Sequence, residues 1–369
     1  MQIRNSCTYE KQAYRISISL ISFFLQCKNS TESVDEGYVA PVFPETKEIT
    51  VECLNDSFIF DIGGIDQLDT LLICSGKTDI NDYVFHLFSK NSGAYIKSFG
   101  TIGQGPCEIS WPVMGYSTDR KEDKVYCYDA MQTKMVEYAI RNHNGEIVVE
   151  ANEYMLPPET KNTRGDMCFS IGNGQFITAY SSFFGNSYRF IKTASVDTVS
   201  TCNEYPRLNE PDEFIAVEHS YFSYMGRLAV KPNGKKFVHA TWSGCILEIF
   251  DCKETIRPSV TKRFFEPEYK VTKKNVKYPF VQCAENVVNG IWGMACTDAR
   301  IYAKYRDDSR YKNSGTLIAV FDWEGNPAGM LHFDDGLYDV VIENNDKYGY
   351  AIMRDKKDEG IKLVKFKID

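Results

Sequence analysis

The amino-acid sequence predicts an all-β fold, namely a single six-bladed β-propeller of four-stranded antiparallel blades whose ring is closed by an N-terminal strand. Three observations predict this fold. Aromatic residues, which suit the pleated and half-buried surface of a sheet, make up 14% of the 369 residues. A short strand–turn–strand unit recurs along the chain at roughly the spacing of propeller blades. The last of these units lacks one strand, and the N-terminal region has a spare one.

Each recurring unit is a short apolar strand followed by a turn rich in Asn, Asp and Gly, which is the pattern of a β-hairpin. Residues about 45 to 72 positions apart mark the third strand of successive units. These positions are Phe88, Tyr138, Ile191, Ile249, Phe321 and Phe366. Second strands precede four of them, at 124–129, 175–180, 236–241 and 348–352. Helical periodicity is absent, which argues against a parallel α/β fold.

The two ends of the chain support the count of six blades. The sixth unit finishes near Ile368 after its third strand. Residues 47–54 alternate between charged and apolar side chains, which suits an outer, half-exposed strand. We therefore expect this strand to pair with the last blade, formed by residues 337–369, so that no sheet edge remains at the seam.

The N-terminus has the features of an export signal. Arg4, Lys11 and Arg15 precede the apolar run 16–25, which is the length of a signal-peptide core and too short to span a bilayer. Gln26 and Cys27 follow, before a polar stretch. This resembles bacterial lipoprotein signals, in which the cysteine becomes the lipidated first residue, although the residue before it is normally small and here is Gln26. The alternatives are a plain secretory signal and a buried N-terminal strand. We therefore expect a signal peptide over 1–26, a flexible tether over 27–45 and the propeller over 46–369.

A family resemblance follows from the segment 97–109, which reads KSFGTIGQGPCEI. It resembles the FGxxGxGPGEF signature of the TolB-like six-bladed propeller lipoproteins of Bacteroides-type bacteria. The segments 321–327, 337–341 and 349–352 resemble that family's last blades. The sequence departs from the signature at Cys107, where the family has Gly, and at Ile109, where it has Phe. The resemblance implies a fold and an export route, and it implies little about chemistry.

The glycine-rich loop within this segment is better interpreted as structural than as a phosphate site, because no Lys-Ser or Lys-Thr follows it. We expect Gly100, Gly103 and Gly105 to permit positive φ in a tight turn between blades. Pro106 would stiffen that turn, and Glu108 would accept backbone N–H bonds inside it.

Charge and cysteine content exclude several classes of function. The net charge is -8 and no basic patch stands out, which argues against a nucleic-acid partner. The 12 cysteines include no Cys-x-x-Cys pair, so a zinc framework or a thioredoxin-type motif is not predicted. Cys74, Cys127 and Cys245 lie in apolar runs, where we expect them to be small buried hydrophobes.

No local motif predicts catalysis, a metal site or a cofactor. Gly-x-Ser-x-Gly is absent, and none of the five histidines forms His-Glu-x-x-His. His219 and His239 lie in one unit and would bind metal only if distant blades bring them together at the channel. The alternative is that they are ordinary core or surface residues.

Aromatic residues of the fourth and fifth units are the candidate binding residues. With nearby arginines they could hold a sugar ring or a peptide, and the alternative is that they fill the space between blades. The candidates are Tyr224, Arg227, Trp242, Trp292 and Arg300, with Tyr221 and Phe222 beside them.

These observations predict an exported outer-membrane lipoprotein, facing the periplasm or the cell surface, that binds a protein, peptide or carbohydrate. Its contact with the membrane would be through the lipid alone. Two alternatives remain, a metal-dependent lyase or hydrolase sited in the channel and a structural subunit of a surface complex, because propellers host many functions.

Overall fold

The computed structural model describes most of the chain from residue 38 onward. The described residues are 38–57, 61–77, 83–110, 116–129, 131–157, 163–180, 188–195, 198–204, 221–253, 257–272, 280–284, 287–305, 315–354 and 360–368. The leader and Cys27 therefore lie outside the described residues.

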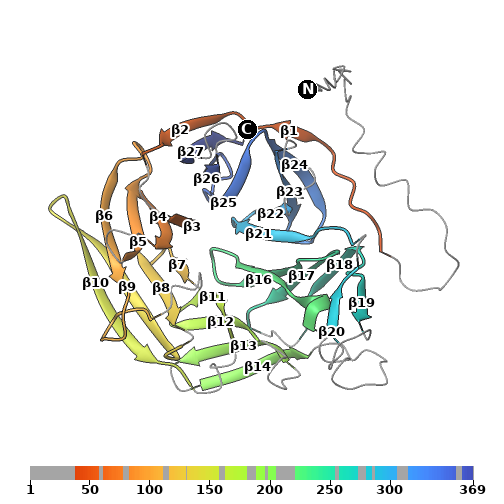
Figure 1. Ribbon diagram of the computed structural model, residues 1–369, viewed down its shortest axis with the longest axis horizontal. Helices are drawn as coiled ribbons and strands as arrows, with labels where there is room; N and C mark the ends of the chain where they lie inside the picture. The colour runs from red at the N-terminus through yellow and green to blue at the C-terminus, as the bar shows by residue number, and fades with distance from the viewer. Residues whose placement is uncertain are drawn as a thin grey trace, which may run out of the picture.

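Six sheets are arranged around a central axis as the blades of a propeller (Figure 1). In blades 1 to 4, four consecutive strands pair antiparallel in chain order, with the first strand nearest the axis. Blade 1 consists of β3 (Asp61–Gln67), β4 (Leu71–Lys77), β5 (Tyr83–Ser89) and β6 (Tyr95–Thr101). Blade 2 consists of β7 (Tyr116–Asp119), β8 (Lys124–Asp129), β9 (Lys134–His143) and β10 (Glu146–Met155). Blade 3 consists of β11 (Thr163–Gly172), β12 (Gln175–Tyr180), β13 (Tyr188–Ser195) and β14 (Thr198–Glu204), and blade 4 of β15 (Gly226–Val230), β16 (Lys236–Thr241), β17 (Cys245–Asp251) and β18 (Val260–Phe265).

Blades 5 and 6 each take a strand from the N-terminal region. Blade 5 consists of β21 (Ile291–Cys296), β22 (Arg300–Tyr305), β23 (Thr316–Asp322) and β24 (Pro327–Phe333), and blade 6 of β25 (Gly336–Ile342), β26 (Tyr348–Arg354) and β27 (Ile361–Lys367). The short β1 (Thr46–Glu48) pairs parallel to β24, and β2 (Val51–Asn55) pairs antiparallel to β27. The second pairing confirms the predicted closure of the ring by an N-terminal strand.

The strand assignments from sequence match the structure closely. All six marker positions lie in the third strand of their blade, and the four segments proposed as second strands are β8, β12, β16 and β26. The widest interval, between Ile249 and Phe321, contains an additional hairpin of β19 (Tyr269–Thr272) and β20 (Phe280–Cys283). Among the described residues, helix is confined to the single turn 221–224.

The core lies between the blades. The described buried side chains form six clusters, and each cluster joins two neighbouring blades. Aromatic rings meet across these interfaces, for example Tyr126 of blade 2 and Phe176 of blade 3, whose centroids are 5.0 Å apart in an edge-to-face arrangement. Blades diverge from the axis, so large side chains are needed to fill the outer space. This explains the high aromatic content.

An N-terminal strap, which we define as residues 38–55, crosses the outer edges of three blades. The Val39 N–H donates to the Arg263 carbonyl oxygen on β18 of blade 4, at 2.9 Å. The Phe43 ring then packs edge-on against Phe321 of blade 5, before β1 and β2 join blades 5 and 6. The expected start of the propeller at residue 46 coincides with β1, but the preceding residues already contact the blades.

The cysteines that were expected to be buried hydrophobes are buried. Cys74, Cys127 and Cys245 are almost fully inaccessible, and burial raises the pKa of the Cys245 thiol to about 12. Such thiols are inert because the reactive form is the thiolate. Within the described part of the chain, no helix has both the length and the apolar character needed to cross a bilayer.

Candidate functional site

The central channel contains a cavity that is a candidate binding site. The six inner strands β3, β7, β11, β15, β21 and β25 surround a cavity of about 450 Å³. That volume falls within the roughly 300–1,000 Å³ of small-molecule sites. Its wall combines apolar side chains with charged groups from different blades, so it offers both contact area and fixed polar contacts.

One carboxylate lies deep in the channel wall. Asp339 of β25 accepts a hydrogen bond from the Ile65 N–H at 3.0 Å. A Cβ atom on Gly64 would lie 3.2 Å from the Asp339 carboxylate and 3.1 Å from the Tyr116 hydroxyl, so these side chains converge on bare backbone. Burial raises the pKa of Asp339, although the Ile65 N–H and the nearby Lys304 charge oppose the rise.

Lys304 contributes a fixed positive charge to the same wall. Its ammonium donates to the carbonyl oxygens of Leu337 at 2.9 Å and Tyr338 at 2.6 Å. Both bonds cross from blade 5 to blade 6, so this lysine ties β22 of blade 5 to the inner strand β25 of blade 6 as well as facing the cavity. Asp339 and Lys304 were not predicted as site residues from the sequence. The sequence signal that could have identified them is a charged residue inside an otherwise apolar strand.

A second polar group lies where the inner strands end. Asp66 of β3 accepts a hydrogen bond from the Thr118 hydroxyl at 2.8 Å and forms an ion pair with Arg120 at 3.5 Å. These contacts join blades 1 and 2 at the opposite end of the channel from the first residues of β15 and β21.

Three of the candidate binding residues meet where β15 and β21 begin. The rings of Trp242 and Trp292 are stacked with centroids 5.1 Å apart. The Arg227 guanidinium lies 5.4 Å from the Trp242 ring, and its Nε donates to the Trp292 carbonyl oxygen at 3.0 Å. Arg227 and Trp292 line the channel cavity, and Trp242 backs them from the turn after β16.

The other two candidates lie elsewhere. Arg300 is the first residue of β22, and its backbone N–H donates to the Thr297 hydroxyl. This contact lies at the opposite end of blade 5 from Trp292. The Tyr224 ring covers the Arg189 guanidinium, whose central carbon lies 4.5 Å from the ring centroid. Tyr221 and Phe222 pack against each other, and the Phe222 carbonyl oxygen accepts a bond from Tyr269. These side chains fill space around blade 4.

His239 belongs to a buried ion cluster between blades 3 and 4. Arg189 makes two hydrogen bonds to the Glu248 carboxylate and one contact with His239 Nδ1, at 3.0 Å. Burial alone would raise the pKa of Glu248, but the Arg189 charge and the bonds from His239 and Arg189 hold that pKa down, at about 2. His239 is thus engaged within the blades and does not line the channel cavity. His219 lies outside the described residues.

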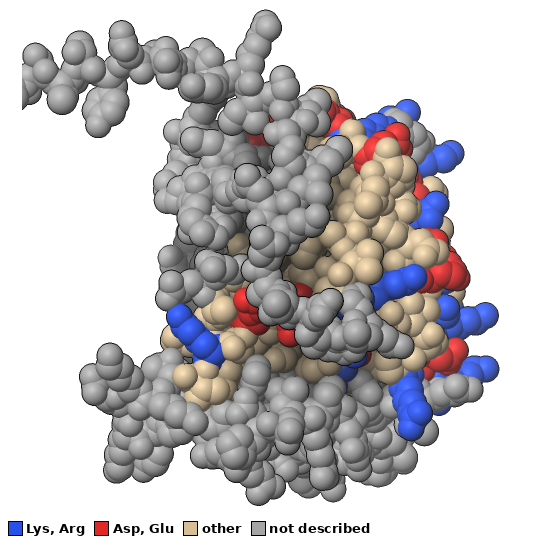
Figure 2. Space-filling view, turned by 90° about the vertical axis from the view of Figure 1, so that its right-hand side faces the viewer, with Lys and Arg blue, Asp and Glu red and all other residues tan. Residues whose placement is uncertain are grey.

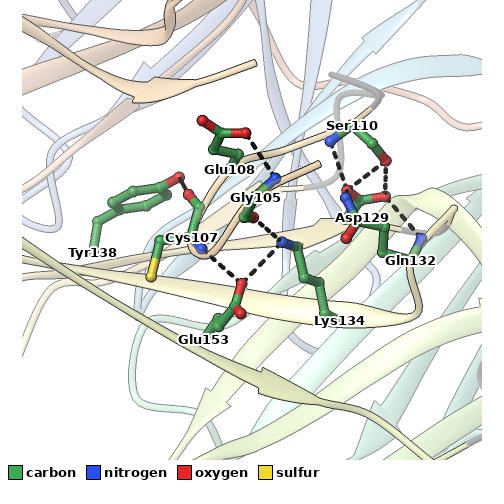
Figure 3. A network of polar contacts seen from close by, with 9 residues as sticks. All are labelled: Gly105, Cys107, Glu108, Ser110, Asp129, Gln132, Lys134, Tyr138 and Glu153. Carbon is green, nitrogen blue, oxygen red and sulfur yellow. Dashed lines mark hydrogen bonds and ion pairs between the residues drawn. The ribbon is translucent and has the colours of Figure 1, made fainter. Parts of the chain in front are cut away.

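The glycine-rich loop forms the crossing from β6 to blade 2, in the polar network of Figure 3. Glu108 accepts a hydrogen bond from the Gly105 N–H at 2.7 Å. Gly100 has a φ of 77°, whereas Gly103 and Gly105 do not have positive φ. Their lack of a side chain serves another purpose, since a Cβ atom on Gly103 would lie 2.0 Å from the Glu108 carboxylate.

Cys107, one of the two departures from the family signature, adopts a left-handed conformation with a φ of 56°. Glycine takes this conformation without steric cost, which explains the glycine in the signature. Here the backbone of Cys107 is held by blade 2 (Figure 3): its N–H donates to Glu153 at 2.7 Å, and its carbonyl oxygen accepts from the Tyr138 hydroxyl at 3.2 Å.

A buried lysine completes the loop's attachment. Lys134 is almost fully inaccessible and donates to the Gly105 carbonyl oxygen and to the Glu153 carboxylate, at 3.1 and 2.9 Å. These contacts lock the crossing onto blade 2.

Comparison with known proteins gives the family. A family model described as TolB-like 6-blade propeller-like matches residues 42–345. A protein of Bacteroides fragilis is 14% identical over 86% of this chain and 94% of its own, with a TM-score of 0.47. A luciferin-regenerating enzyme is 11% identical over 86% and 95%, with a TM-score of 0.48. Hydrazine synthase of Kuenenia stuttgartiensis is 11% identical over 92% and 100%, with a TM-score of 0.40. Among curated proteins, none matches this chain.

Proposed function

The chain belongs to the family of TolB-like six-bladed propellers, and from that premise we propose that it is an exported, lipid-anchored protein that binds a small carbohydrate or a peptide at the channel mouth formed by Arg227, Trp242 and Trp292.

The observation that carries this proposal is the meeting of these three residues at a cavity of about 450 Å³. Sequence analysis named them separately, and they come from three different elements. The Arg227 side chain is held both by the Trp242 ring and by the Trp292 carbonyl oxygen. An arginine fixed in this way loses little freedom when a ligand binds, which favours affinity.

The chemistry of this mouth suits a ring or a peptide group. An indole face offers apolar contact to a sugar ring or a side chain, and a guanidinium offers directed donors to hydroxyl or carbonyl oxygens. Deeper in the cavity, Asp339 provides an acceptor and Lys304 a positive charge. A ligand with both donors and acceptors is therefore the best match.

The path of the strap is compatible with a membrane anchor. Val39 is attached to β18, the outermost strand of blade 4, so a tether leading back to Cys27 leaves from the rim of the ring. Such a tether would hold the propeller at an outer membrane, toward the periplasm or the cell surface, without crossing the channel.

Acidic and basic side chains alternate along the described edge at the right of Figure 2, so neither sign of charge dominates there.

The proposal is tested by titrating the protein with a panel of oligosaccharides and short peptides while recording tryptophan fluorescence and calorimetric heat. We expect one ligand class to bind and Trp292→Ala to weaken that binding by about 1–3 kcal/mol, as for a hot-spot aromatic. Tyr95→Ala, on the outer strand of blade 1, is the matched control and should leave binding unchanged.

Two outcomes would count against this site. If Trp292→Ala lowers the melting temperature strongly and leaves a ligand's affinity unchanged, the indole is packing material and the ligand binds elsewhere. If catalytic turnover is found and is lost in His239→Ala, the enzyme alternative replaces the binding proposal.

A further inference from the structure

Three potential metal ligands meet on the outer edge of blade 5. The parallel pairing of β1 with β24 makes Glu48 and His332 direct partners, and Asp334 follows β24 by one residue (Figure 1). One ligand atom from each residue lies within 4.8 Å of the others. His332 Nδ1 is already 2.6 Å from the Glu48 carboxylate. Sequence analysis assigned no metal ligand, because only this strand register brings Glu48 to His332.

One imidazole and two carboxylates form a ligand set that suits zinc. Zinc takes His nitrogen and Asp or Glu oxygen at about 2.0–2.2 Å in a tetrahedron, with water in a remaining position. Ligand atoms around such an ion lie about 3.3–3.5 Å apart, so small side-chain rotations suffice here. Calcium and magnesium prefer all-oxygen sites, so the imidazole disfavours both.

The freedom needed for these rotations is available. The Glu48 side chain is 73% exposed and Asp334 is also exposed, whereas His332 is held more firmly with 24% exposure. The cluster therefore has one anchored ligand and two that can adjust around an ion. Two carboxylates so close together also repel each other, and a cation would remove that repulsion.

We propose that Glu48, His332 and Asp334 bind a divalent transition-metal ion of the Zn²⁺ type, which clips the strap to blade 5. β1 is only three residues long and sits at a sheet edge, so its pairing alone is weak. A metal bond across it fixes the strap between the tether and β2. This inference is independent of the proposed ligand at the channel mouth.

The test uses the mature full-length chain, stripped of metal and titrated with Zn²⁺ by calorimetry. We expect one equivalent of zinc to bind through this cluster. His332→Ala removes a direct ligand, so it should weaken zinc binding by at least the roughly 10–100-fold that loss of an outer-shell partner costs. His143→Ala, at an exposed histidine on β9, is the matched control and should bind zinc as the wild type does. Asp334→Asn keeps the side-chain shape and should also weaken binding.

Hydrogen exchange tests the clip itself. Zinc should slow amide exchange in β1 but not in β8, and the slowing should vanish in His332→Ala. If His332→Ala binds zinc as tightly and with the same stoichiometry as His143→Ala, the site is wrong. If zinc binding is lost in His332→Ala but exchange in β1 never responds to zinc, the site stands as a metal site and the clip is refuted.

Discussion

Val51 and Phe366 are partners in one antiparallel ladder, although they lie at opposite ends of the chain. Through this pairing β2 completes blade 6, and the Phe366 ring packs edge-on against Phe333 of blade 5, 5.0 Å away. The seam of the ring is thus closed by backbone hydrogen bonds and by the same kind of aromatic packing that joins the other blades.

Removal of residues 1–54 should therefore open the seam. It deletes β1 and nearly all of β2, and the ladder bonds lost are worth about 1 kcal/mol each, so we expect the free energy of unfolding to fall by about 3–5 kcal/mol. The measurement is urea denaturation. A chain lacking only residues 1–37 retains both strands and should unfold like the mature protein. Equal stability of the two truncated chains would show that β2 is not the closing element.

The buried cluster of Arg189, His239 and Glu248 predicts a dependence of stability on pH. The folded-state pKa of Glu248, about 2, lies below the ordinary value of 4.5 for a glutamate. The stability that its carboxylate contributes is therefore complete above pH 4.5 and is lost as the pH falls toward 2. Glu248→Gln leaves the buried Arg189 charge uncompensated and should cost about 3–5 kcal/mol at pH 7.

Thermal melts should show that the difference in stability between the wild type and Glu248→Gln decreases as the pH falls from 4.5 to 2. The exposed pair of Arg141 and Glu150 provides the control, since Glu150→Gln should cost less than about 1 kcal/mol. A constant gap across this pH range would show that the Glu248 carboxylate is not the titrating group.

Gly103 should be intolerant of a methyl group because of Glu108. The added Cβ would displace the Glu108 carboxylate and break its bond to the Gly105 N–H, so Gly103→Ala should cost about 1.5–3 kcal/mol. In a Glu108→Ala background the same change should cost much less. Gly329→Ala is a suitable control, because the nearest atoms to its Cβ lie 4.0 Å away. Additive effects of the two substitutions in denaturation experiments would contradict this account.

Cys27 should carry the lipid of the mature protein. Its position two residues after the end of the apolar run predicts that Cys27→Ala blocks processing or releases the protein from membranes. Cell fractionation and the mass of the mature chain measure this. Cys7→Ala, upstream of the apolar run, is the matched control and should change neither result. Unaltered membrane association and mass in Cys27→Ala would refute lipidation.

Sequence patterns predicted the blades because their signals are local. Alternating apolar residues around Asn-, Asp- and Gly-rich turns define β8, β12, β16 and β26, and the missing last strand predicted the closure. The channel wall was less accessible to sequence analysis. Asp339, Lys304 and Arg227 come from three blades, and no short-range pattern places their side chains together. The same reason hid the pairing of Glu48 with His332.

The pairing of β2 with β27 also determines when, during synthesis, the ring can close. During synthesis β2 emerges long before its partner β27, so blade 6 can close only after β27 has been made. Until then β2 has an unpaired edge, which is prone to association with other chains. An export route that keeps the chain unfolded until its C-terminus has crossed the membrane would avoid this exposure.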